Sequence, residues 1–285
     1  MTVDTPASPR RVRRAGWGAF IWPGLVFLAL MFVYPFAETA WRSLTDPGPE
    51  NYDIFRTDPV YLRSLVTTFL TAVIVTVTAL VIAYPYAYVM YRAGPKLRVL
   101  LTILVLLPFF TSLLVRTYAW TVWLQQTGII NNALLDTGII DEPLSLMRNT
   151  LGVTVGMTHA LLPFMVFPIF ASMLRIPKDL MPAARTLGAG EAHAFRTVFV
   201  PLSLPGIVSG SLIVFVMSLG YYVTPALLGS PDNAMLSELI VNQVETQLAF
   251  GVGAAIGVVL LVATFVVLAI GSRLVGFRSI ASGGR

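Results

Sequence analysis

Side chains that could catalyse a reaction or bind an ion are scarce in this sequence. It has 285 residues, no cysteine, and two histidines, His159 and His193, too far apart for metal-ligand spacing. The lack of cysteine excludes disulfides, thiol catalysis and iron–sulfur ligation. The only lysines, Lys96 and Lys178, both follow proline, so no Gly-Lys-Ser or Gly-Lys-Thr phosphate loop exists. We therefore expect no metal or cofactor bound by this chain, and any ATP must be hydrolysed by another subunit.

The stretch from Arg175 to Gly188 could contact such a subunit. Asp179 is a plausible N-cap for a short helix through Leu187, with Gly188 ending the helix at C′. Pro182 would then be the third helical residue, where its missing N–H removes no internal bond. Ala183 and Ala184 give a face that another protein can approach closely. The alternative is an ordinary amphipathic helix in the membrane interface, and the spacing alone does not separate the two.

A second set of polar side chains could form a gate or solute pathway. Arg116 lies inside an apolar stretch, about 26 Å along a straight helix at ~1.5 Å per residue. It either extends to the interface or acts in gating, in which case Glu38 is an expected partner. Tyrosine rings can hold an ammonium group, although interfacial anchoring is the alternative for Tyr221 and Tyr222. The candidate pathway residues are Arg116, Tyr118, Glu38, Tyr221, Tyr222 and Thr224.

The elements that carry these residues are long apolar segments. With 56% hydrophobic and 12% charged residues, the chain cannot be a water-soluble enzyme. A helix needs ~20 mostly apolar residues to cross a bilayer, and its backbone groups must pair within the segment. The sequence therefore predicts an all-α integral membrane bundle of six helices, over Phe20–Trp41, Leu65–Tyr91, Val99–Trp123, Leu151–Leu174, Val198–Leu219 and Gly251–Ile270.

The distribution of positive charge predicts the orientation. Fourteen of the 19 lysines and arginines fall in the N-terminal arm, the second and fourth loops, and the tail. By the positive-inside rule both termini are cytoplasmic, so the net charge of +5 indicates topology rather than nucleic-acid binding. The opposite loops are acidic. These acidic residues would concentrate a cationic solute. The alternative is that the positive-inside rule places the basic residues in the cytoplasm and so leaves an excess of acidic ones outside.

Two patterns concern how the helices pack. Glycines four residues apart favour close helix association. They occur as Gly152 and Gly156, Gly206 and Gly210, and Gly253 and Gly257. Aromatic residues at the ends of the second and third segments are typical of interfacial anchors. These are Tyr84, Tyr86, Tyr88 and Tyr91, and Trp120 and Trp123.

These residues distinguish three classes of membrane protein. A gradient-driven carrier or channel usually holds acidic or histidine side chains at membrane depth, and a membrane-embedded enzyme needs acid, base or metal groups. The second to sixth segments contain no Asp or Glu, and a lone His159 is more often a hydrogen-bonded packing residue. A non-catalytic permease driven by separate ATPase subunits is therefore favoured.

The loop resembles the "EAA" motif of binding-protein-dependent ABC importer permeases. Ala183, Ala184 and Gly188 match the motif, Val198, Val200 and Pro201 match its apolar-x-apolar-Pro ending, and Pro182 stands where the family often has Glu. Three further stretches resemble permeases of the spermidine/putrescine type. They are Leu107–Trp120, Phe195-Arg196 with Pro201–Gly206, and Val223–Gly229. The loop residues implied to couple to the ATPase are Asp179, Pro182, Ala183, Ala184, Leu187, Gly188, Val198 and Pro201.

The resemblance implies a type I (MetI-like) importer fold in the cell inner membrane, surrounded by lipid. It implies a second, similar permease, two ATPase subunits that use ATP and Mg, an extracytoplasmic solute-binding protein, and a polyamine or related small solute. The expected organisation is a basic arm over 1–19, a first helix and outer loop over 20–63, a five-helix type-1 domain over 64–271, and a cytoplasmic tail over 272–285.

Overall fold

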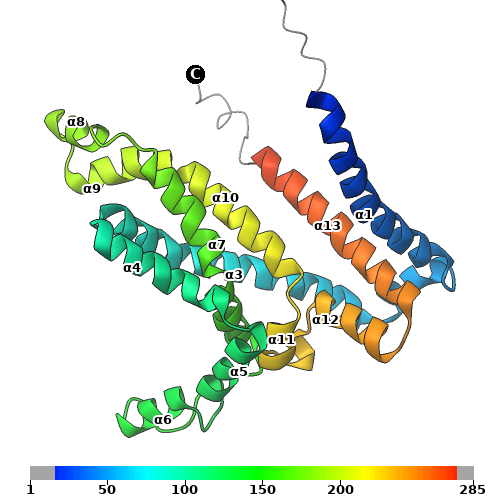
Figure 1. The fold of residues 1–285 in the computed structure, drawn as a ribbon. Coiled ribbons are helices and arrows are strands. Elements are labelled where there is room, and N and C mark those ends of the chain that lie inside the picture. The colour runs from blue at the N-terminus through cyan, green and yellow to red at the C-terminus, as the bar shows by residue number, and fades with distance from the viewer. Residues whose placement is uncertain (1–16, 275–285) are drawn as a thin grey trace, which may run out of the picture.

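The computed structural model describes residues 17–274, without the side chains of residues 17–20, 272 and 274. Within that range, five helices are long and apolar enough to cross a membrane (Figure 1). They are α1 (Trp17–Thr45), α3 (Pro59–Arg92), α7 (Thr150–Leu174), α10 (Val200–Leu219) and α13 (Phe250–Leu274). The predicted arm and tail lie mostly outside the described residues, with Arg10, Arg11, Arg13, Arg14, Arg278 and Arg285.

Shorter helices connect the long ones, mostly at the two ends of the bundle. They are α2 (Ile54–Thr57), α6 (Ile129–Asp136), α8 (Leu180–Thr186), α9 (Glu191–Ala194), α11 (Val223–Leu228) and α12 (Leu236–Val241). Short 3₁₀ turns form η1 (Pro49–Tyr52) and η4 (Pro231–Asn233), and π-helical turns form η3 (Phe195–Phe199) and η5 (Asn242–Thr246).

Local sequence explains where two of the long helices begin. Asp58 is the N-cap of α3, and its carboxylate accepts a hydrogen bond from the backbone N–H of Val60 at 2.9 Å. Asn149 does the same for α7, through the N–H of Gly152 at 2.9 Å. Each cap satisfies one of the backbone donors that the first turn leaves free. Both long helices therefore start at residues whose side chains replace the missing backbone partner.

The third predicted segment is broken rather than continuous. It consists of α4 (Pro95–Leu106), the 3₁₀ turn η2 (Leu107–Phe110) and α5 (Leu113–Leu124). The two parts, Pro95–Phe110 and Leu113–Asp136, are bent by 98° at the break. Thr111 is extended there, with φ −90° and ψ 148°, so no regular helix passes through it. The straight-helix position predicted for Arg116 is therefore wrong, because Arg116 lies in the first turns after the break.

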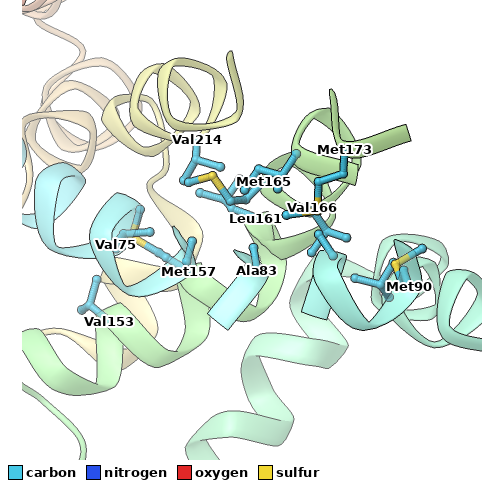
Figure 2. Packing of buried hydrophobic residues seen from close by; sticks show 14 of the residues in the cluster. Val75, Ala83, Met90, Val153, Met157, Leu161, Met165, Val166, Met173 and Val214 are labelled. Carbon is cyan, nitrogen blue, oxygen red and sulfur yellow. The ribbon is translucent and has the colours of Figure 1, made fainter. Parts of the chain in front are cut away.

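The core is built where α7 packs along α3 and α10. Small residues Ala79, Ala83 and Ala87 lie at four-residue spacing on one face of α3 and are fully buried. Opposite them, α7 contributes large flexible side chains, among them Met157 and Met165 (Figure 2). Small residues on one helix and unbranched methionines on the other let the two backbones approach closely without leaving gaps.

Glycines permit the closest of these approaches. A Cβ atom added to Gly206 of α10 would lie 2.5 Å from the carbonyl oxygen of Pro168 in α7, and one added to Gly210 would lie 2.9 Å from the sulfur of Met165. Gly156 is similarly close to side chains of α11. The prediction of close association is thus confirmed at these glycines. It is wrong at Gly257, where an added Cβ would meet nothing within 4 Å.

Helices α1 and α13 form an antiparallel pair beside this core (Figure 1). The pair joins the core through short segments at one end. There the side-chain amide of Gln243 donates to the hydroxyl of Tyr61 at 2.8 Å, and that of Asn51 donates to the carbonyl of Asp46 at 2.9 Å. An added Cβ on Gly251 would overlap the Asp46 carbonyl oxygen at 1.5 Å, so only glycine fits that crossing.

Candidate coupling loop and solute pathway

Helix α8 forms at the expected place in the loop between α7 and α10. Asp179 occupies the N-cap position, although its side chain makes no capping hydrogen bond, and the N–H of Ala183 donates to its carbonyl at 2.9 Å. Pro182 is the third residue of the helix, so its missing N–H leaves no carbonyl unpaired. The predicted helix is therefore present, but the side chain of Asp179 is free for another partner.

The end of α8 matches the predicted stop. Gly188 has a φ of +85°, which side-chain-bearing residues rarely adopt. Its N–H donates to the carbonyl of Arg185 at 2.9 Å, and the N–H of Ala189 donates to the carbonyl of Ala184 at 3.1 Å. This pair of bonds is the Schellman arrangement, in which a left-handed residue satisfies the last helix carbonyls. Gly188 thus fixes the direction in which the chain leaves α8.

One face of α8 contacts the bundle and the other is open. Met181 packs against the core, whereas Leu187 at the end of the helix is 89% exposed and Ala183 and Pro182 are also exposed. A single exposed apolar side chain is ordinary, but Pro182, Ala183 and Leu187 together leave an apolar surface of this loop uncovered, and contiguous apolar surface is typical of a contact for another protein. The outer face of α8 can therefore receive a partner without unpacking the core.

An ion pair ties α8 to the following helix. Nη2 of Arg185 lies 2.9 Å from Oε1 of Glu191 in α9. Both side chains, with Tyr88 and Arg92 from the end of α3, line a pocket of about 420 Å³. Sequence reasoning missed this pair, since Arg185 and Glu191 lie on different helices separated by a turn. The pocket places the end of α3 and the α8–α9 turn at the same end of the bundle.

An aromatic cluster connects this turn to the core. Phe195 and Phe199 stack in η3 with ring centroids 5.5 Å apart, and both pack edge-on against Tyr88. The hydroxyl of Tyr84 lies 3.1 Å from that of Ser203 in α10. Tyr84 and Tyr88, which were predicted as interfacial anchors, are half-buried and also contact the protein. Val198 lies half-buried within η3, and Pro201 is exposed in the first turn of α10.

Three of the predicted pathway residues come together where α5 meets α11. Arg116 and Tyr221 line one pocket of about 200 Å³ with Thr111 and Phe164. The hydroxyls of Thr117 and Thr224 lie 3.3 Å apart and are buried. On another side of Arg116, the indole N–H of Trp120 donates to Nδ1 of His159 at 3.1 Å. His159 is thus a hydrogen-bonded packing residue, as predicted.

The other predicted pathway residues lie elsewhere. Tyr118 is 68% exposed on the outside of α5, and Tyr222 is exposed beside Tyr221. The carboxylate of Glu38 accepts a hydrogen bond from Nε of Arg42 at 2.8 Å, one turn along α1. Arg116 donates instead to the carbonyl of Pro108. The predicted pairing of Arg116 with Glu38 is therefore wrong, because each has a nearer partner on its own segment.

No group of three histidine, aspartate or glutamate side chains comes close enough to hold a metal ion within residues 17–274. The described residues form an exposed face on α8, a packed aromatic connection from α8 to the core, and a polar cluster around Arg116. Together with the apolar helices, these features define a multi-pass membrane protein with an exposed short helix at one end.

Comparisons with known proteins assign this class to a family. Residues 93–276 match the family described as "Binding-protein-dependent transport system inner membrane component". The chain is 36% identical over 183 residues to the spermidine/putrescine transport system permease protein PotB of Salmonella typhimurium (strain SL1344), covering 64% of each. It is 34% identical over 220 residues to PotB of Haemophilus influenzae, covering 76% of each. The match thus spans less than two thirds of the length of the first of these relatives, 64%.

The fold has a relative among solved structures. A chain in the crystal structure of a bacterial alginate ABC transporter, in complex with alginate pentasaccharide-bound periplasmic protein, superposes with a TM-score of 0.74. That match covers 90% of this chain and 92% of the other at 15% identity, so it shows a shared fold. The chain belongs to the family of binding-protein-dependent transport system inner membrane components, and it is a multi-pass inner-membrane protein.

Proposed function

We propose that this chain is the transmembrane permease subunit of an ATP-driven, binding-protein-dependent importer, and that it is not itself an enzyme. The observation that carries the proposal is the open outer face of α8, with Leu187 89% exposed at its end. A permease without a phosphate-binding loop needs such a contact to be driven from outside. Relatives that are 34% and 36% identical to this chain are named transport system permease proteins, which supports the same function.

Both ends of the chain are proposed to face the cytoplasm, together with α8. Arg92, Lys96 and Arg98 lie where α3 turns into α4, and Arg175, Lys178, Arg185 and Arg196 surround the α8–α9 turn. The other end carries most of the acidic residues. If each long helix and the bent segment cross the bilayer once, the start of α1 and the end of α13 lie on the α8 side, which the positive-inside rule assigns to the cytoplasm.

The partners proposed for this chain are four. A second homologous permease completes the path, and two ATPase subunits, which bind ATP and Mg, dock at the cytoplasmic end. One ATPase contacts α8 of this chain through Ala183, Leu187 and the free carboxylate of Asp179. An extracytoplasmic binding protein delivers solute to the acidic outer end. The long apolar helices are surrounded by lipid.

Coupling would run through the residues that join α8 to the core. When the ATPase subunits close, α8 moves with them, because Leu187 and Ala183 are held by the partner. The motion passes through the Arg185–Glu191 pair and the stacked rings of Phe195 and Phe199 to α3 and α10. Packed rings transmit such a displacement because they cannot be compressed.

The proposed cargo is a polyamine such as spermidine or putrescine, or a related small solute. The PotB relatives are named for this transport, and the acidic outer loops of this chain would raise the local concentration of a cation. Acidic residues at that end include Asp46, Glu50, Asp53, Asp58, Asp136, Asp141 and Glu142.

Uptake of labelled putrescine and spermidine tests this function. The chain would be produced with its second permease, ATPase and binding protein in a strain that lacks polyamine importers. We expect ATP-dependent uptake that an excess of unlabelled polyamine blocks and that an equal excess of a dicarboxylate or an oxyanion leaves unchanged. Inhibition by the anions alone would contradict the polyamine cargo, and uptake without the ATPase would contradict the proposed permease function.

A further inference from the structure

The break in the third segment is bridged by hydrogen bonds to one carbonyl group. The carbonyl oxygen of Pro108 accepts from the backbone N–H of Thr111 at 3.3 Å, from the hydroxyl of Thr111 at 2.8 Å, and from Nη1 of Arg116. Pro108 lies in η2 and Arg116 lies in α5, so the guanidinium spans the bend of 98°. Backbone groups left without partners at a break in hydrocarbon are strongly destabilising, which gives this bridge its physical reason.

Arg116 has no carboxylate partner in the described part of the chain. The ion pairs between residues 17 and 274 are Glu38–Arg42 and Arg185–Glu191. Its Nε atom is buried and makes no hydrogen bond. What faces the guanidinium is the carboxyl end of the α4–η2 helix, whose last carbonyls carry partial negative charge. The charge is therefore held by a helix end, and the hydrogen bond to Pro108 sets where it lies.

Groups that hold α5 in place adjoin Arg116 on both sides. The next residue, Thr117, pairs with Thr224 of α11. The arginine itself lines two pockets, one with Tyr221 and one with Trp120 and His159. The angle at the break therefore decides where α5 meets α11 and α7. A change of that angle would move Tyr221 and Thr224 as well.

A second arginine in the same segment makes the same kind of contact. Arg98, in the first turn of α4, donates from Nε to the carbonyl of Met90 at 3.1 Å and from Nη2 to those of Tyr91 and Ala93 at 3.3 and 3.2 Å. These carbonyls end helix α3. Arg98 of α4 thus binds the last carbonyls of α3, and Arg116 of α5 binds a carbonyl at the end of the α4–η2 helix.

We propose that Arg116 is a positioning residue that fixes the angle of the broken third segment by binding the Pro108 carbonyl, so that α4 and α5 move as one rigid elbow. Arg116 then acts through the elbow rather than as a solute ligand, because its hydrogen bond to Pro108 joins the two sides of the break. The effect on transport rests on the proposed function above. The effect on the angle does not.

The angle can be measured directly, because the chain contains no cysteine. Cysteines replacing Leu104 in α4 and Val122 in α5, which are 52% and 36% exposed, would carry spin labels, and their separation would be measured by pulsed electron paramagnetic resonance in lipid nanodiscs. We expect one narrow distance distribution in the parent and in Arg116→Lys, which keeps a donor for the carbonyl. In Arg116→Met the distribution should broaden and its mean should shift.

Arg98→Met is the matched control, since it removes an equivalent arginine from the other end of α4. It should leave the distance between positions 104 and 122 unchanged. A narrow, unshifted distribution in Arg116→Met would overturn the proposal. So would a distribution in Arg116→Lys as broad as that in Arg116→Met, because the carbonyl bond would then not set the angle.

Transport by the assembled importer separates positioning from solute binding. Loss of a hydrogen bond to a charged group predicts that Arg116→Met lowers the maximal uptake rate by about tenfold, with KM unchanged and with recovery in Arg116→Lys. A raised KM at an unchanged maximal rate would instead make Arg116 a solute ligand and overturn the proposal. If the parent took up no polyamine, the proposed cargo would fail, while the distance measurement would still decide the role of Arg116.

Discussion

The hydroxyl of Tyr84 on α3 meets the hydroxyl of Ser203 on α10 at 3.1 Å, immediately beside the stacked rings of η3. Ser203 also donates to the carbonyl of Val200 in its own helix, at 2.8 Å. The two hydroxyls therefore join the two helices proposed to receive motion from α8. Removing the Tyr84 hydroxyl leaves Ser203 bonded to Val200, whereas removing the Ser203 hydroxyl takes away the protein partner of Tyr84.

A double-mutant cycle on this pair measures the link. Tyr84→Phe and Ser203→Ala should each lower the free energy of unfolding by about 1 kcal/mol. The double variant should lose about 0.6 kcal/mol less than the sum, which is the average for hydrogen bonds between membrane helices. The readout is unfolding in detergent micelles. If the losses in free energy of unfolding are additive, the interaction energy is zero and the two hydroxyls do not stabilise the protein through their contact.

The crossing of α7 and α10 should not tolerate a methyl group at Gly206. An added Cβ would lie 2.5 Å from both the Pro168 carbonyl oxygen and Ser172 Cβ, so Gly206→Ala should cost about 1–3 kcal/mol of stability. Gly257→Ala is the matched control in α13, where nothing lies within 4 Å, and it should be neutral or slightly stabilising. Thermal unfolding in detergent compares them. Equal midpoints would contradict the close packing of α7 and α10 at Gly206.

The left-handed turn after α8 should require glycine. Gly188→Ala forces a side chain to a φ of +85°, at about 1–2 kcal/mol, and should redirect the chain leaving α8. Gly190→Ala is the control, since Gly190 has a φ of −64° and open space around it. Uptake per ATP hydrolysed in the assembled importer should fall for Gly188→Ala alone. A parent-like ratio in that variant would remove α8 from the coupling path.

Glu238 should make the acidic end of the bundle sensitive to pH. Burial raises the pKa of this carboxyl above its ordinary 4.5, partly opposed by the backbone N–H of Met235, which donates to it at 2.8 Å. The folded protein therefore holds this proton more tightly than the unfolded chain does. The stabilisation is present at low pH and is lost as the pH rises from about 4.5 through the raised value.

Glu238→Gln is the variant that tests this, because it keeps an oxygen that can accept from Met235 but does not titrate. The difference in unfolding midpoint between the parent and Glu238→Gln, followed from pH 4 to pH 8, should change in favour of the variant as the pH rises. A difference that stays constant across that range would mean that Glu238 titrates normally.

Hydropathy predicted the membrane-spanning segments because a helix that spans a bilayer must be apolar along its whole length. The break at Pro108 could not be predicted in the same way, since Pro85, Pro163 and Pro168 lie inside helices that continue through them. What distinguishes Pro108 is a contact eight residues away, with Arg116. Counting along a straight helix therefore placed Arg116 wrongly.

The candidate coupling loop, from Arg175 to Gly188, was more predictable because its structure follows from local rules. The N-cap position of Asp179, the third-residue proline and the glycine stop all follow from spacing within one short helix. The Arg185–Glu191 pair depends on the angle between α8 and α9, and the packing of Tyr88 on Phe195 depends on the position of α3. No pattern along the chain specifies those angles.

We have proposed that a partner drives this chain through the outer face of α8. Leu187→Asp places a charge at the most exposed part of that face, and Ile139→Asp places one on a residue that is 69% exposed near the acidic end. In proteoliposomes with all partners, we expect ATP-driven polyamine accumulation by the parent and by Ile139→Asp, and a loss of at least tenfold in Leu187→Asp together with loss of the bound ATPase. Uphill accumulation by the chain alone, or parent-like uptake by Leu187→Asp, would contradict the claim.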